Sequence, residues 1–189
     1  MTPRAAAQSL TNLDATAWIE AAFDALAEGG IDAVRIDPLA KRLGVTRGSF
    51  YWHFPDRAAL HQAVLKEWRK RQSYSVGTRI ESRTSAPDER LRQTLALPNA
   101  SGRATRAAAI ELAIRLWARR DGEAAKAVRH IDHVRLSYYA KLYGELGFDA
   151  AEARRRAFIF YASLMAQAFI VTDADTDVSG DLADVLLRG

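Results

Sequence analysis

The feature that most constrains the fold is residues 46–54, together with the short helix and turn before them. Residues 37–43 are predicted to form a helix that Asp37 caps, with Pro38 at its first position, where no backbone N–H is needed. Gly44 permits the left-handed backbone that ends this helix, and Thr46 caps a second helix of about two turns. Two helices joined by a short glycine-containing turn are typical of a helix-turn-helix.

The side chains of the second helix suit contact with double-stranded DNA. The major groove is about 12 Å wide, so the slim tip formed by Gly48 and Ser49 could enter it. Arg47 and the Thr46 hydroxyl could then reach base edges, and Arg47 is the residue type that binds O6 and N7 of guanine. The hydroxyl of Tyr51 and the imidazole of His53 suit phosphate oxygens, whereas Phe50 and Phe54 are expected to anchor the helix in its own core.

The distribution of charge agrees with this interpretation. The chain has a net charge of +4, but residues 35–71 contain nine Lys and Arg against three Asp and Glu, a net charge of +6. Residues 172–189 contain five Asp and one Arg, a net charge of −4. Solvated faces of ordinary helices would produce the same charges, so it is the motif that favours nucleic-acid binding.

The remainder of the chain is predicted to be helical, which makes the fold class all-α. Apolar residues recur at helical spacing over residues 14–28, 56–74, 88–97, 103–120, 123–146 and 149–171. We expect an N-terminal three-helix DNA-binding domain and a C-terminal helical domain for ligand binding and dimerisation. The expected division is 1–13 flexible arm, 14–55 helix-turn-helix domain, 56–76 connecting helix and 77–189 regulatory and dimerisation domain.

The last long predicted helix indicates a homodimer. Between residues 157 and 171 only Ser163 and Gln167 are strongly polar. This stretch is too short to span a bilayer, yet it is apolar on all sides and must be covered on more than one. Its own domain can cover one side and an identical subunit the other, so that two helices from each subunit form a four-helix bundle.

Residues 14–68, and above all residues 39–57 followed by Leu60, resemble the DNA-binding domain of the TetR (tetracycline-repressor) family. The resemblance implies the same domain order, with the last two long helices forming the homodimer and a small-molecule effector controlling binding to a palindromic operator. It also implies that a basic residue at Arg57 binds a phosphate, where the family usually has lysine. Arg35 stands where a threonine often opens the second helix. The predicted DNA contacts are Lys41, Thr46, Arg47, Gly48, Ser49, Tyr51, Trp52, His53 and Arg57.

Candidate effector contacts are a charge and several aromatic side chains of the C-terminal region. These residues are Glu111, Trp117, Tyr138, Tyr139 and Phe158. Aromatic residues of this kind also form ordinary cores, and Glu111 could simply pair with Arg115. Two alternatives therefore stay open: a regulator that ignores small molecules, and an all-helical small-molecule binding or adaptor protein without specific DNA recognition.

The sequence gives no indication of an enzyme. It has no phosphate-binding glycine loop, no Gly-x-Ser-x-Gly motif, no His-Glu-x-x-His motif and no cysteine. His130 and His133 could share a helix face and hold a metal only with a third ligand from elsewhere, so we expect no catalytic residue, metal or cofactor. The N-terminus lacks the pattern of a signal peptide, and the chain has no apolar run of membrane-spanning length. The expected location is therefore cytoplasmic.

Overall fold

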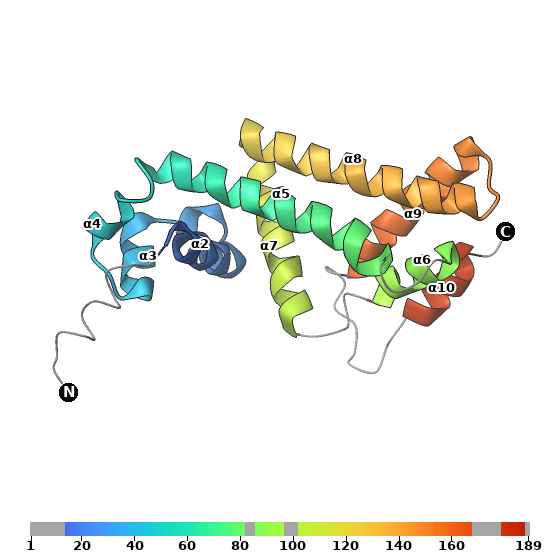
Figure 1. Cartoon of the computed structure of the whole chain (residues 1–189), viewed down its shortest axis with the longest axis horizontal. Helices are drawn as coiled ribbons and strands as arrows, with labels where there is room; N and C mark the ends of the chain where they lie inside the picture. Colours follow the sequence, from blue (N-terminus) through green and yellow to red (C-terminus); the bar gives the residue numbers. More distant parts are fainter. Residues whose placement is uncertain (1–13, 82–85, 97–101, 168–178, 188–189) are drawn as a thin grey trace. The chain divides into compact units, whose positions relative to one another are not determined.

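The computed structural model describes residues 14–81, 86–96, 102–167 and 179–187, and every regular element within these ranges is a helix (Figure 1). The all-α prediction is confirmed. None of the described helices is long and apolar enough to cross a membrane. In chain order the elements are α2 (Ala15–Gly29), the 3₁₀ turn η1 (Ile31–Ala33), α3 (Ile36–Leu43), α4 (Arg47–Phe50), α5 (Arg57–Glu81), α6 (Pro87–Ala96), α7 (Gly102–Ala118), α8 (Gly122–Glu145), α9 (Ala150–Gln167) and α10 (Ser179–Leu187).

The chain divides into two compact units. The first combines residues up to Arg69 with Ala109–Val128, and the second combines Lys70–Ala108 with the residues from Arg129 onward. This grouping differs from the division expected from the sequence, because the C-terminal part of α7 belongs to the first unit. Trp117 of α7 packs its ring against His61 of α5, and Arg120 pairs with Asp32 of η1 at 3.0 Å.

The first unit has a core in which aromatic side chains are fully enclosed. Asp14 caps α2 by accepting a hydrogen bond from the N–H of Ala17 at 3.0 Å. The buried Trp18 of α2 meets Phe50 of α4 edge to face, with ring centroids 5.2 Å apart. Such pairs stabilise by about 0.5 to 1.5 kcal/mol beyond the area they bury. They hold the short α4 against a much longer helix.

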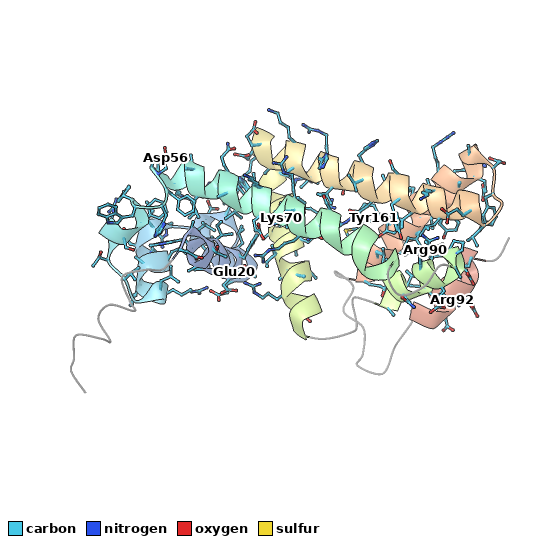
Figure 2. The ribbon with its side chains drawn as sticks, in the orientation of Figure 1. Glu20, Asp56, Lys70, Arg90, Arg92 and Tyr161 are labelled. Carbon is cyan, nitrogen blue, oxygen red and sulfur yellow. The ribbon has the colours of Figure 1, made fainter. Side chains whose placement is uncertain are left out.

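The second unit is built around the packing of α8 against α9. Tyr139 and Phe160 lie with ring centroids 4.7 Å apart in a buried cluster that also receives Leu91 and Leu95 from α6. Helix α10 packs against α6, and Arg92 pairs there with Asp184 at 2.8 Å (Figures 1 and 2). The sequence analysis described this C-terminal stretch only as an acidic tail.

Two buried arginines of the second unit are paired. The hydroxyl of Tyr161 donates to Oδ1 of Asp132 at 2.7 Å and accepts from Nη1 of Arg135 at 2.8 Å. Figure 2 shows Tyr161 and also Arg90, whose Nη2 lies 2.7 Å from Oε2 of Glu145. A buried charge is tolerated only when it is paired and hydrogen-bonded. These pairs therefore favour one register between the helices that carry them.

Several predicted helix ends were wrong by one or more residues. The N-cap of α3 is Arg35 and not Asp37, because the N–H of Leu39 already bonds to the carbonyl of Arg35 at 3.1 Å. Helix α5 continues to Glu81 instead of ending near residue 74. Helix α9 is described as far as Gln167, and the predicted continuation to residue 171 lies outside the described residues.

Candidate nucleic-acid interface

The turn between α3 and α4 is set by Gly44. Its φ of 69° lies in the left-handed region, which costs any residue with a Cβ about 1 to 2 kcal/mol. The N–H of Val45 bonds to the carbonyl of Ala40 at 3.0 Å, and the N–H of Gly44 bonds within the same last turn of α3. These bonds satisfy the end of the helix and fix the direction in which the chain leaves it. The predicted helix-turn-helix is present.

Helix α4 is anchored from one side only. Phe50 and Phe54 are buried with ring centroids 5.5 Å apart, which confirms their predicted role as anchors. The regular part of the helix, Arg47–Phe50, is shorter than the two turns expected, and residues 51–53 continue as a turn closed by the bond from the N–H of His53 to the carbonyl of Phe50. Thr46 occupies the N-cap position, but its side chain makes no capping hydrogen bond. Its hydroxyl therefore has no structural partner at the helix end.

The opposite side of α4 is open to solvent. Trp52 is 88% exposed and Tyr51 is 48% exposed. Because Trp52 is this exposed, its ring does not shield the core. Ser49 and His53 are half-buried at the edge of this face. The predicted DNA contacts that are exposed are Lys41, Thr46, Arg47, Gly48, Tyr51 and Trp52.

Arg47 lies on this open face with only weak partners. Its Nη2 is 3.4 Å from the hydroxyl of Tyr51, and its Nη1 is 3.6 Å from Oδ2 of Asp37. The hydrogen bond to Tyr51 and the nearby charge of Asp37 raise the pKa of Arg47 above its usual value, so the guanidinium stays charged. Ion pairs between exposed groups contribute little to stability. Arg47 can therefore exchange these partners for a base edge or a phosphate at small cost.

Gly48 is not required by the fold of a single chain. A Cβ built on it would meet Oγ1 of Thr46 at 3.6 Å, an ordinary van der Waals distance, and its φ is not positive. A helix position normally favours alanine over glycine by about 1 kcal/mol. Close approach by another molecule is a physical reason for glycine at this exposed place.

Arg57 begins α5, but its side chain turns inward in part. Asp56, labelled in Figure 2, caps this helix by accepting from the N–H of Ala59 at 2.8 Å. Nη2 of Arg57 donates to the carbonyl of Ile31 at 3.1 Å, and Nε donates to Nε2 of His61, also at 3.1 Å. A guanidinium carries five N–H groups, so three remain for an external acceptor.

His61 is a residue that the sequence analysis missed. The available signal was its spacing, since residues four apart on a helix are neighbours and His61 follows Arg57 by four. A second basic residue near the motif, Arg42, is instead paired with Glu28 of α2. This pairing agrees with leaving Arg42 out of the predicted contacts.

The candidate effector contacts do not lie together in one unit. Glu111 and Trp117 belong to the first unit, where Glu111 pairs with Arg115 at 2.8 Å and Trp117 packs against His61. In the second unit, the buried Tyr139 is part of the core, and Tyr138 lies beside it with ring centroids 5.7 Å apart. Phe158 is 66% exposed on the outside of α9, so it does not line an enclosed cavity of its unit.

The histidine pair of α8 gains no third ligand among the described residues. His130 and His133 are both exposed, and no group of three His, Cys, Asp or Glu residues gathers in those parts of the chain.

Comparison with known proteins places the described motif in a family. Residues 19–64 match the profile of bacterial regulatory proteins of the tetR family. The class A tetracycline repressor from transposon 1721 of Escherichia coli is 42% identical over 57 residues, which cover 30% of this chain and 26% of that protein. This match thus spans about a quarter of the relative's length.

Solved structures show the same fold over almost the whole chain. A transcriptional regulator from Rhodococcus sp. Rha1 has a TM-score of 0.71 at 19% identity, covering 93% of this chain and 92% of its own. AibR, solved with isovaleryl coenzyme A and operator DNA, has a TM-score of 0.66 at 15% identity, covering 92% of this chain and 95% of its own. Residues 19–64 therefore match the tetR family of bacterial regulatory proteins, and the chain as a whole shares its fold with solved transcriptional regulators.

Proposed function

We propose that this protein is a sequence-specific DNA-binding transcriptional regulator, a repressor that a small-molecule ligand releases from a palindromic operator. The observation that carries the proposal is the one-sided anchoring of α4. Phe50 holds the helix in the core while Arg47, Gly48 and Trp52 stand exposed. None of these three residues packs into the core, and each residue type suits a nucleic-acid groove or backbone.

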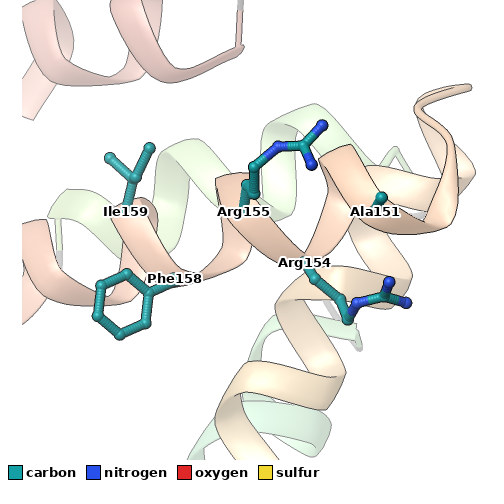
Figure 3. A pocket seen from close by; sticks show the side chains of 5 residues that line it. All are labelled: Ala151, Arg154, Arg155, Phe158 and Ile159. Carbon is teal, nitrogen blue, oxygen red and sulfur yellow. The ribbon is translucent and has the colours of Figure 1, made fainter.

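The proposal includes a homodimer formed through α8 and α9. The outward side of α9 carries Phe158 and Ile159, which are 66% and 53% exposed (Figure 3). They line an open hollow together with Ala151, Arg154 and Arg155. A helix that exposes two neighbouring large apolar side chains is suited to packing against an identical helix. A dimer would set two copies of α4 about 34 Å apart, one turn of B-DNA, or a multiple of that distance.

The proposal also includes control by an effector bound in the C-terminal helical region. The operator complex of AibR contains isovaleryl coenzyme A, which shows that a protein of this fold binds both kinds of partner. Of the three predicted contacts in the second unit, Phe158 is exposed, whereas Tyr139 is buried and Tyr138 is half-buried, so the proposal keeps the two tyrosines as effector contacts. A ligand regulates only if it binds the DNA-competent and DNA-incompetent conformations with different affinity.

The deciding experiment compares two DNA duplexes of equal length. One carries the intergenic sequence upstream of the protein's own gene, and the other carries a random sequence of the same base composition. We expect the intergenic duplex to bind at least about a hundred-fold more tightly at physiological salt, with both affinities falling as salt rises. Equal affinity for both duplexes at two salt concentrations would contradict the regulator and favour an adaptor without specific DNA recognition.

A second measurement separates the two kinds of regulator. Protection of the intergenic DNA from nuclease is mapped with and without candidate metabolites, including isovaleryl coenzyme A. Loss of protection with one of them supports release by a ligand. Unchanged protection with cell extract and with every metabolite tried would favour the ligand-independent regulator.

A further inference from the structure

His61 lies at the centre of a small cluster behind the DNA-binding motif, and every member of the cluster belongs to the first unit. Nε2 of His61 accepts the hydrogen bond from Nε of Arg57 at 3.1 Å. The ring also forms a hydrogen bond with the backbone of Val34 and packs edge to face on Trp117, with ring centroids 5.2 Å apart. The imidazole is therefore held by the residue that follows η1, by α5 and by α7 at once.

These contacts define the protonation state of the ring. A histidine nitrogen that accepts a hydrogen bond carries no proton, so Nε2 is bare and Nδ1 is the donor to Val34. The N–H of Val34 is already used, because it bonds to the carbonyl of Ile31 at 3.2 Å, which leaves the Val34 carbonyl as the acceptor. A protonated ring could not accept from Arg57 and would place a second positive charge beside the guanidinium.

The guanidinium is thereby fixed at two of its five N–H groups. One goes to His61, and another goes to the carbonyl of Ile31 at 3.1 Å. Without the ring, Arg57 would keep a single fixed contact, so ordering its long side chain on a phosphate would cost conformational entropy. Pre-ordering a charged side chain removes part of that cost from the binding step.

We propose that His61 is a positioning residue for DNA binding: its neutral ring holds Arg57 so that the remaining guanidinium N–H groups face a DNA phosphate, and its contact with Trp117 links this arrangement to α7. This inference rests on the proposed function and assigns it a residue outside the helix-turn-helix motif. It also means that a displacement of α7 would reach Arg57 through Trp117 and His61.

Charged groups around the ring decide how pH acts on the arrangement. Arg57 on α5 disfavours the protonated ring, and Asp121, just after α7, favours it. Asp32 of η1 is paired with Arg120 at 3.0 Å, so the charges of this pair largely cancel in their effect on the ring. Burial is the largest influence and lowers the pKa of His61 below its usual value. Near neutral pH the ring is therefore in the form that accepts from Arg57, and acidification removes that form.

The test uses the full-length protein and a random-sequence 40-base-pair duplex, because a phosphate contact does not depend on sequence. The variants are Arg57→Ala, His61→Leu, the double variant, and His61→Gln, whose side-chain oxygen can replace the acceptor. We expect His61→Leu to weaken binding about three- to ten-fold and Arg57→Ala to reduce the slope of log affinity against log salt by about 1. The double variant should bind no more weakly than Arg57→Ala, and His61→Gln should stay within about two-fold of wild type.

The dependence of DNA affinity on pH gives a second measurement, which a purely structural role of His61 would not affect. As pH is lowered from 7.5 through the reduced pKa of His61, the wild type should lose affinity relative to His61→Gln, in which residue 61 cannot be protonated. His53 is common to both proteins, so any contribution from it cancels in the ratio. Additive losses in the double variant, or equal pH profiles for wild type and His61→Gln, would overturn the positioning role even if His61→Leu folds poorly. The proposed function fails separately, when the intergenic duplex binds no better than the random one.

Discussion

Nη2 of Arg47 lies 3.4 Å from the hydroxyl oxygen of Tyr51, one turn further along the exposed side of α4. The distance is at the long end for a hydrogen bond, so the contact orients the guanidinium without holding it firmly. In this position Arg47 can turn toward a base edge without leaving a buried group unsatisfied. The guanidinium of Arg47 therefore points away from the core in which Phe50 is buried.

Replacing Arg47 with alanine should therefore reduce specificity more than general affinity. We expect Arg47→Ala to weaken binding to the intergenic duplex about ten- to a hundred-fold, with a much smaller loss on the random duplex. Fluorescence anisotropy at one salt concentration measures both. Lys126→Ala removes an exposed basic residue outside the motif and serves as the matched control. An equal proportional loss on both duplexes would show that Arg47 contacts only phosphate.

Two glycines four residues apart should respond in opposite ways to the same substitution. Gly44→Ala forces a Cβ into the left-handed region and should lower the free energy of unfolding by about 1 to 2 kcal/mol. Gly48→Ala should leave it unchanged or raise it by up to about 1 kcal/mol, because the added methyl group meets nothing closer than 3.6 Å. Thermal unfolding distinguishes the two.

DNA binding should then separate stability from function at Gly48. We expect Gly48→Ala to fold normally and yet bind the intergenic duplex at least about ten-fold more weakly, because the methyl group stands where the groove must approach. A variant that is both stable and fully active would mean that α4 does not insert its tip.

The helix-turn-helix could be predicted from the sequence because its signals are local. Gly44 needs only its own backbone conformation, and Phe50 needs only the buried side of one helix. The N-cap of α3 was predicted wrongly because the prediction used only the local capping propensity of Asp37. In the structure, Arg35 already supplies the first carbonyl of the helix. Capping propensity therefore located the start of α3 approximately but did not identify the capping residue.

The features that the sequence did not reveal depend on contacts between distant segments. His61 gains its role from Trp117, which lies 56 residues later, and this partner has no signature near His61 itself. Helix α10 was missed because its acidic residues suggest a solvated tail, whereas the buried Ala183 and the pair of Asp184 with Arg92 tie it to the second unit. Local pattern could not supply either relationship.

Stability should depend on pH through His61. In the unfolded chain this ring takes up a proton near pH 6.5, whereas burial, followed by the charge of Arg57, lowers its pKa in the folded chain. Below pH 6.5 the unfolded state therefore binds more protons, so the free energy of unfolding falls as pH drops toward the folded pKa. Denaturant unfolding at pH 7.5 and 5.5 should show a smaller decrease for His61→Gln than for wild type.

The matched control for this measurement is His130→Gln, which removes an exposed histidine from α8. It should retain the full wild-type decrease between the two pH values. If His61→Gln loses stability as steeply as wild type, the ring does not remain neutral in the fold, and the hydrogen bond from Arg57 to its Nε2 is not maintained in solution.

The last prediction concerns the exposed side of α9, because binding to a palindromic operator depends on a dimer. Phe158 and Ile159 stand 66% and 53% exposed, and a glutamate in their place would put an unpaired charge into any interface formed there. We expect sedimentation velocity at micromolar concentration to show a dimer for wild type and a monomer for Phe158→Glu. Val185→Glu, at a 74% exposed apolar position on α10, should remain dimeric. A dimeric Phe158→Glu would move the interface to another surface, whereas a monomeric wild type would remove the physical basis for a palindromic operator.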